Sequence, residues 1–245
     1  DGIRLSFAQS FSFAHNDTNE LEKKLKAVPI NADRKIFVIT ESVFSMDGDF
    51  CCLQEIIDLC KKFNAHLIID EAHATGVIGE KGEGFVQKEN MQNEIFCRIY
   101  TYGKACGVHG AAVVGSKKLK DYLINFARSF IYTTALPEHA VAAINASYQT
   151  FPFLHNERNH LKELINYFQH AALRFKKLVS ETPIQVIIIP GNDLVKQIAS
   201  QLQTANLDVR PILYPTIPAG KERLRIVLHS FNTKEQLQIL IENLS

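Results

Sequence analysis

The sequence of 245 residues lacks the features that mark several common classes of protein. Its five cysteines are odd in number, and none lies in a Cys-x-x-Cys pair or at the Cys and His spacing of a metal site. Neither a disulfide framework nor a bound metal is therefore predicted, and reduced thiols in the cytoplasm are expected instead. The net charge of +1, with both signs interspersed, predicts no surface for nucleic acid or an anionic membrane.

Long apolar runs, internal repeats and low-complexity segments are also absent. The longest apolar runs are far shorter than the about 20 residues that cross a bilayer as a helix. A chain of 245 residues can still bury a substantial core, in one large or two modest domains. The sequence begins at Asp1-Gly2-Ile3 without an initiator methionine, and we expect it to be a fragment.

Short apolar runs alternate with helical patterns in the first part of the chain, which indicates an α/β fold. Strands are predicted at residues 36–39, 67–69, 95–100 and 111–114, and a helix at residues 53–60. In open α/β sheets the residues that do chemistry gather beyond the carboxyl ends of the strands. Glu41, Asp70 and Thr101 each follow a predicted strand, so these three are expected to meet at one crevice.

The pattern changes beyond Pro137 and predicts a smaller α+β domain. A long helix over 161–178 is followed by a strand over 185–189, a helix over 195–202, a strand over 224–228 and a closing helix over 237–244. Thr233 and Gln236 have the spacing of a capping box for that last helix. We therefore predict two domains, residues 1–136 and residues 137–245.

Lys104 and Asp70 carry the most specific chemistry. Lys104 lies between Gly103 and Ala105 after an apolar run, where small neighbours leave its amine free to form a Schiff base with an aldehyde cofactor. Asp70 ends another apolar run and is the residue type that keeps a pyridine nitrogen protonated, so that pyridoxal phosphate can act as an electron sink. His73, three residues further on, could reach the phenolic oxygen of the same ring.

Three segments together resemble the α-oxoamine synthases, fold-type I pyridoxal phosphate enzymes that condense an amino acid with an acyl thioester and lose carbon dioxide. They are residues 40–49 (TESVFSMDGD), 70–76 (DEAHATG) and 101–111 (TYGKACGVHGA). The resemblance runs along the whole chain, but the family's first third is absent. It implies an aspartate aminotransferase-like fold, with a mostly parallel sheet in the large domain, and pyridoxal 5'-phosphate as cofactor.

The resemblance also implies roles for the cofactor-binding residues. Lys104, Asp70 and His73 would be catalytic and would hold the cofactor. Ser45 would lie against the cofactor ring, and Thr101 would contact its phosphate.

Two further positions concern a second subunit and the substrate. Thr133 and Thr134, which follow a strand predicted at residues 130–132, would reach the phosphate of a neighbouring subunit's cofactor, and this implies a homodimer with shared sites. Arg223 and Arg225 would share one face of a strand. In the family the second arginine binds the substrate carboxylate, which an arginine fork can hold bidentately; a solvated charged face is the alternative.

The prediction of the substrate depends on two motifs that lie next to the expected catalytic residues rather than among them. Residues 13–17 (FAHND) and 107–111 (GVHGA) favour the branch of the family that uses alanine and a pimeloyl thioester. Branches that use glycine or serine with acetyl, succinyl or palmitoyl donors share the other motifs and stay open.

The motif at residues 70–73 also has other interpretations. Asp70 could cap a helix after a strand, and His73 could be a buried structural histidine. The same four letters occur in ATP-driven helicases, where Asp70 and Glu71 would hold magnesium and activate water. That alternative needs a Gly-x4-Gly-Lys-Ser/Thr phosphate loop, which the sequence lacks.

Overall fold

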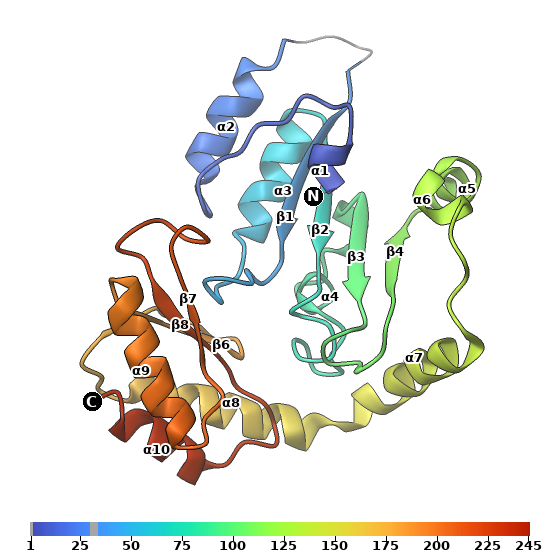
Figure 1. Ribbon diagram of the computed structural model, residues 1–245. Helices are drawn as coiled ribbons and strands as arrows, with labels where there is room; N and C mark the ends of the chain where they lie inside the picture. The colour runs from blue at the N-terminus through green and yellow to red at the C-terminus, as the bar shows by residue number, and fades with distance from the viewer. Residues whose placement is uncertain (1, 30–33) are drawn as a thin grey trace.

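A four-stranded sheet forms the first part of the molecule, in the order β1-β2-β3-β4 (Figure 1). The computed structural model describes residues 2–29 and 34–245. The first three strands are parallel to one another, and β4 is antiparallel to β3. The predicted α/β fold with a mostly parallel sheet is confirmed. The strands are β1 (Ile36–Glu41), β2 (Ala65–Asp70), β3 (Cys97–Thr101) and β4 (Ala111–Gly115).

Helices α2 (Thr18–Ala27) and α3 (Leu53–Lys62) pack beside this sheet. The buried face of α3 is the predicted one, made of Leu53, Ile56, Ile57 and Cys60, because residues three and four apart share one side of a helix. The other helical segments of this part are short or exposed. They are α1 (Gly2–Leu5), α4 (Phe85–Lys88), η1 (Gln92–Glu94), α5 (Lys117–Phe126) and α6 (Arg128–Ile131).

A long helical run crosses to the second part of the molecule (Figure 1). It consists of α7 (Glu138–Thr150), η2 (Phe151–Phe153) and α8 (His155–His170). The prediction of a helix as far as Leu178 is wrong. The chain turns extended at Ala171, and the side chain of Lys177 donates to the carbonyl oxygens of Phe168 and Ala171, at 2.6 and 2.9 Å, which satisfies the end of α8.

The second sheet is entirely antiparallel, in the order β5-β6-β8-β7. Its strands are β5 (Lys176–Lys177), β6 (Ile184–Ile188), β7 (Arg210–Ile212) and β8 (Arg223–Val227). Helices α9 (Asn192–Thr204) and α10 (Lys234–Glu242) accompany it. The predicted capping box is confirmed, since Thr233 and Gln236 bond reciprocally at the start of α10.

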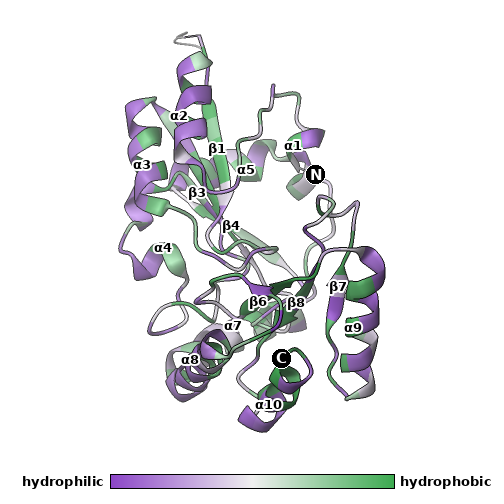
Figure 2. Cartoon of the chain, turned by 90° about the vertical axis from the view of Figure 1, so that its left-hand side faces the viewer, coloured by the Kyte–Doolittle hydropathy of each residue, from purple (hydrophilic) through white to green (hydrophobic). Residues whose placement is uncertain are grey.

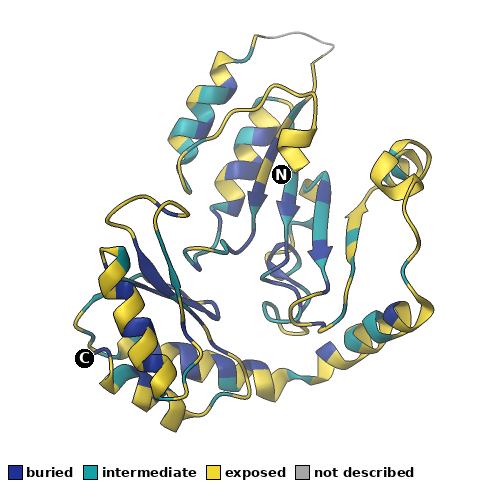
Figure 3. Cartoon of the chain, viewed as in Figure 1, coloured by how far each residue is buried: buried dark blue, intermediate teal, exposed yellow. Residues whose placement is uncertain are grey.

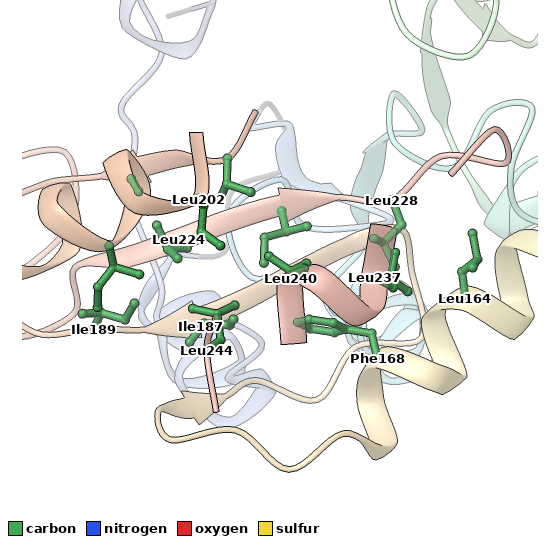
Figure 4. Close-up of a cluster of buried hydrophobic side chains, with 14 of the residues drawn as sticks. Leu164, Phe168, Ile187, Ile189, Leu202, Leu224, Leu228, Leu237, Leu240 and Leu244 are labelled. Carbon is green, nitrogen blue, oxygen red and sulfur yellow. The ribbon is translucent and has the colours of Figure 1, made fainter. Parts of the chain in front are cut away.

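One apolar cluster joins this sheet to α8, α9 and α10 (Figure 4). Figure 2 shows these helices as alternately hydrophilic and hydrophobic, as expected where one side of a helix faces a core. Phe168 of α8 is fully buried there, together with Leu164, Ile187, Leu202 and Leu224.

The two sheets are tied together by the loop after β1. The hydroxyls of Ser180 and Thr182 donate to the carbonyl of Gly48, at 2.7 and 2.8 Å. Gly48 has a φ of +78°, and a Cβ there would lie 2.2 Å from the carbonyl oxygen of Ile184, so a larger residue would separate the two parts. The predicted domain division at residues 136 and 137 falls between α6 and α7 and stays a prediction.

Among the residues that the structure describes, no helix is both long enough and apolar enough to cross a membrane.

Replacing Phe168 with alanine is expected to lower the free energy of unfolding by about 3–5 kcal/mol, because it leaves a cavity in a packed core. Phe153→Ala is the matched control, since Phe153 is 77% exposed, and should change it by less than about 0.5 kcal/mol. Urea denaturation of both variants measures the difference. Equal stability of the two variants would show that the cluster is not the core described here.

Candidate active site

The carboxyl ends of the three parallel strands lie side by side. Glu41 at the end of β1 pairs with Asp70 at the end of β2, and Asp70 pairs with Ile99 of β3, two residues before Thr101. The expectation that these strand ends meet is therefore confirmed. The loops that follow them carry Ser45, His73 and Lys104.

Asp70 has one carboxylate oxygen engaged locally. Its Oδ1 accepts a hydrogen bond from the N–H of Ala72 at 2.8 Å, as in an Asx turn. Asp70 does not cap a helix, because the next helix along the chain, α4, begins only at Phe85. Within residues 2–29 and 34–245, the structure gives Oδ2 no hydrogen-bond donor. Asp70 therefore keeps acceptor capacity for a ligand.

Glu71 points the other way, into the core, and is completely buried. Its carboxylate accepts from the Ser42 hydroxyl at 3.0 Å and from the N–H groups of Phe85 and Val86 at 2.9 and 2.8 Å. Burial raises its pKa. The helicase alternative is wrong. The buried carboxylate of Glu71 already binds backbone N–H groups at the start of α4, so it is not placed to hold a metal ion together with Asp70.

His73 and Lys104 line one cavity of about 810 Å³. The loop after β2, the Lys104 loop, the start of α8 and the end of β8 form its walls, which include Phe151, Arg158 and Arg225. Burial lowers the pKa of His73 to about 4, and the positive charges of Lys104 and Arg225 add to the effect. His73 is therefore neutral near pH 7, with one ring nitrogen able to donate.

The Lys104 loop has a defined shape. Tyr102 donates its N–H to Gly110 at 2.9 Å and accepts from the N–H of Val108 at 2.8 Å, while the N–H of Gly107 bonds the Lys104 carbonyl at 2.9 Å. Lys104 itself is exposed at the tip. The glycine-rich run after the lysine thus closes a tight loop that presents the amine to the cavity.

Arg225 reaches the same cavity from the second sheet. Its Nε donates to the carbonyl of Ser45 at 2.6 Å, and Arg223 binds Asp47 at 2.7 Å through Nη1. Both arginines thus face the 45–47 segment, as period-two alternation on β8 predicted. Burial lowers the pKa of Arg225, and the nearby charge of Glu41 raises it.

Ser45 and Thr101 lie at the strand ends but not on the wall of this cavity. Ser45 is bonded to Glu41 through both its N–H and its hydroxyl. The Oγ1 of Thr101 is buried and has no hydrogen-bond partner in the described part of the chain. A buried hydroxyl without a partner is costly, and a polar ligand group would satisfy it.

Thr133 and Thr134 are exposed and lie apart from the cavity lining. The strand predicted before them is wrong: Phe130 and Ile131 both donate their N–H groups to the carbonyl of Ala127 and form the short helix α6. This chain alone does not bring the two threonines to Lys104.

Sequence reasoning missed most of the cavity wall, including the buried charged residue Arg158. Arg158 is 6% exposed and donates to the carbonyls of Phe151 and Glu80, at 2.7 and 2.5 Å. It lies three residues before Leu161 on the buried stripe of α8. A charged residue on an apolar helix face was the signal in the sequence.

The chain belongs to the aminotransferase class I and II family, whose model matches residues 1–244. A protein of Geobacillus kaustophilus named putative 8-amino-7-oxononanoate synthase is 39% identical, over 99% of this chain and 62% of that protein. A solved 8-amino-7-oxononanoate synthase of Francisella tularensis is 30% identical, with a TM-score of 0.82, over 99% of this chain and 69% of that one. A solved serine palmitoyltransferase with pyridoxal phosphate is 25% identical, with a TM-score of 0.88, over 99% and 62%.

These comparisons confirm the resemblance to the α-oxoamine synthases. They also show that the chain spans about 62% of the length of the curated relative. The residues present fit pyridoxal phosphate: an acceptor carboxylate ends β2, a neutral imidazole follows it, an amine follows the adjacent β3, and the Thr101 hydroxyl, which has no partner among the described residues, ends β3.

The low pKa of His73 predicts a pH dependence of stability. Between about pH 6.5 and about pH 4 the unfolded chain binds a proton at His73 that the folded chain does not, so the free energy of unfolding falls as the pH falls through this window. His73→Asn should make this fall shallower, and His155→Asn, at an exposed position, should not. Denaturation series at pH 4 to 7 test this; equal slopes for wild type and His73→Asn would contradict it.

Proposed function

We propose that the protein carrying this chain is a pyridoxal phosphate-dependent acyltransferase that condenses L-alanine with a pimeloyl thioester. Carbon dioxide and the thiol are released, and the product is 8-amino-7-oxononanoate, an intermediate of biotin biosynthesis. The observation that carries the proposal is the arrangement of Lys104, His73 and Arg225 around one cavity, with Asp70 at the adjacent strand end. The 39% identity to a relative of that name supports the choice of substrates.

The cofactor would supply an electron sink for the carbanion formed at the α-carbon of the amino acid. Lys104 would bind it covalently through Nζ, and Asp70 would keep its ring nitrogen protonated through the free Oδ2. His73 would donate its N–H to the ring oxygen.

Two hydroxyls would complete the binding of the cofactor. Ser45 would lie against the ring, and Thr101 would donate to the phosphate. Thr133 and Thr134 would contact the phosphate of a neighbouring subunit.

Arg225 and Lys104 would act directly on the amino-acid substrate. Arg225 would hold the carboxylate of the amino acid and so orient the α-carbon toward Lys104. Lys104, once its amine is free, would remove the α-proton and return a proton after carbon dioxide is lost. The walls of the cavity, with Phe151 among them, would exclude water from these steps.

A homodimer with shared sites is part of the proposal. Thr133 and Thr134 are exposed, and the neighbouring helices α5 and α6 bury no residue and expose Phe126, Phe130 and Tyr132 (Figure 3). Exposed aromatic clusters of this kind mark interaction surfaces. If analytical ultracentrifugation shows a monomer under conditions in which the protein is fully active in the assay, the dimer is contradicted.

We also propose the cytoplasm as the place of action, which the five free cysteines support. Localisation of a tagged protein to a secreted fraction would contradict it.

A second candidate, serine palmitoyltransferase activity, is favoured by the TM-score of 0.88 to the solved enzyme. Serine differs from alanine by one added hydroxyl group, which a pocket that fits alanine rejects only weakly by binding. Turnover rather than binding must decide.

The test is thiol release by the full-length protein, with alanine, glycine and serine each offered against pimeloyl, acetyl, succinyl and palmitoyl thioesters. Alanine with the pimeloyl thioester is expected to give the highest kcat/KM, by about tenfold or more over any other pair. Lys104→Ala is the matched control and should release no thiol above background. A faster reaction of serine with the palmitoyl thioester would replace the proposal by the second candidate.

A further inference from the structure

Glu41 has no role in the proposal so far, yet both of its carboxylate oxygens accept hydrogen bonds from Ser45. Its Oε2 accepts the N–H of Ser45 at 3.0 Å, and its Oε1 accepts the Ser45 hydroxyl at 3.3 Å. A serine hydroxyl has a single proton. Because the Ser45 hydroxyl donates that proton in its hydrogen bond to Glu41, its oxygen can accept, but not donate, a hydrogen bond to a ligand.

Ser45, held by Glu41, in turn fixes the position of Arg225. The carbonyl of Ser45 accepts from Nε of Arg225 at 2.6 Å, which fixes one edge of the guanidinium. In the described ranges the structure gives neither terminal nitrogen of Arg225 a hydrogen-bond acceptor, and Arg225 lines the cavity. The free edge of a guanidinium can donate two parallel hydrogen bonds to the two oxygens of a carboxylate.

The charge of Glu41 is secondary to these hydrogen bonds. Burial lowers the pKa of Arg225 and the negative charge of Glu41 raises it. Because a guanidinium stays protonated near pH 7 in either case, Glu41 acts on Arg225 through the hydrogen bonds of Ser45.

We infer that Glu41 is a positioning residue for the carboxylate of the amino-acid substrate, acting through Ser45 and Arg225. This rests on the proposed function. Glu41 does not line the cavity itself; it holds the Ser45 main chain so that the carbonyl meets Nε and the two terminal nitrogens of Arg225 face the substrate.

The experiment is a titration of the cofactor-loaded protein, followed by the visible absorbance of pyridoxal phosphate. The two ligands are alanine and alaninol, which lacks the carboxylate. Glu41→Ala should weaken alanine binding by about tenfold or more, because the fork is no longer aligned, and change alaninol binding by less than about threefold. Glu41→Gln keeps an acceptor for the Ser45 N–H and should bind alanine within about threefold of wild type.

In turnover, Glu41→Ala should raise KM for alanine and leave KM for the acyl thioester unchanged. Glu94→Ala is the matched control, because Glu94 forms an exposed ion pair with Lys61 at 2.8 Å and should affect neither ligand. If Glu41→Ala does not fold, Glu41→Asp withdraws the carboxylate from Ser45 by one methylene and must show the same alanine-specific loss.

Three results would overturn the inference: unchanged alanine binding in Glu41→Ala, equal weakening of alanine and alaninol, or Glu41→Gln as weak as Glu41→Ala. A wild-type protein that responds to neither ligand would contradict the proposed function, and this inference with it.

Discussion

The candidate site depends on the parallel register of β1, β2 and β3. Because Glu41, Asp70 and Ile99 are paired across these strands, their following loops start at one edge of the sheet. Side chains alternate between the two faces of a strand, so a slip of one residue would turn Asp70 to the opposite face. The buried residues Val38, Leu67 and Ile69 prevent such a slip, since it would expose them to water.

The second constraint is the loop at residues 45–48, which both sheets hold. Arg223 is buried and pairs with Asp47 at 2.7 Å, and two hydroxyls from the 180–182 segment bind Gly48. Asp47 is partly exposed but Arg223 is not, so loss of the Asp47 carboxylate would leave a buried charge without its partner, which is costly. This loop therefore sets where Arg225 lies relative to Asp70 and Lys104.

Much of this arrangement could be predicted from the sequence. Short continuous apolar runs indicated the strands, and the 3.6-residue period indicated α3. The family motifs indicated Lys104, Asp70, His73 and Arg225, three of which line the cavity while Asp70 ends the adjacent strand.

The predictions failed where local pattern and tertiary pairing compete. Residues 172–178 continue the apolar stripe of α8, but Leu178 donates its N–H to Val186 and the segment joins the second sheet. Phe130 and Ile131 look like a strand, yet no neighbouring strand pairs with them in the described chain, and they form a helical turn. The contact of Arg225 with Ser45 and the contact of Arg158 with Glu80 join residues far apart in the sequence, so no local pattern identifies these partners.

A crystal structure of the protein with pyridoxal phosphate would test the central claim most directly. The account predicts continuous density from Nζ of Lys104 to the cofactor, the ring nitrogen within hydrogen-bond distance of Asp70, and the phosphate at Thr101. Cofactor bound elsewhere, or at this cavity with Lys104 unattached and Asp70 turned away, would contradict it.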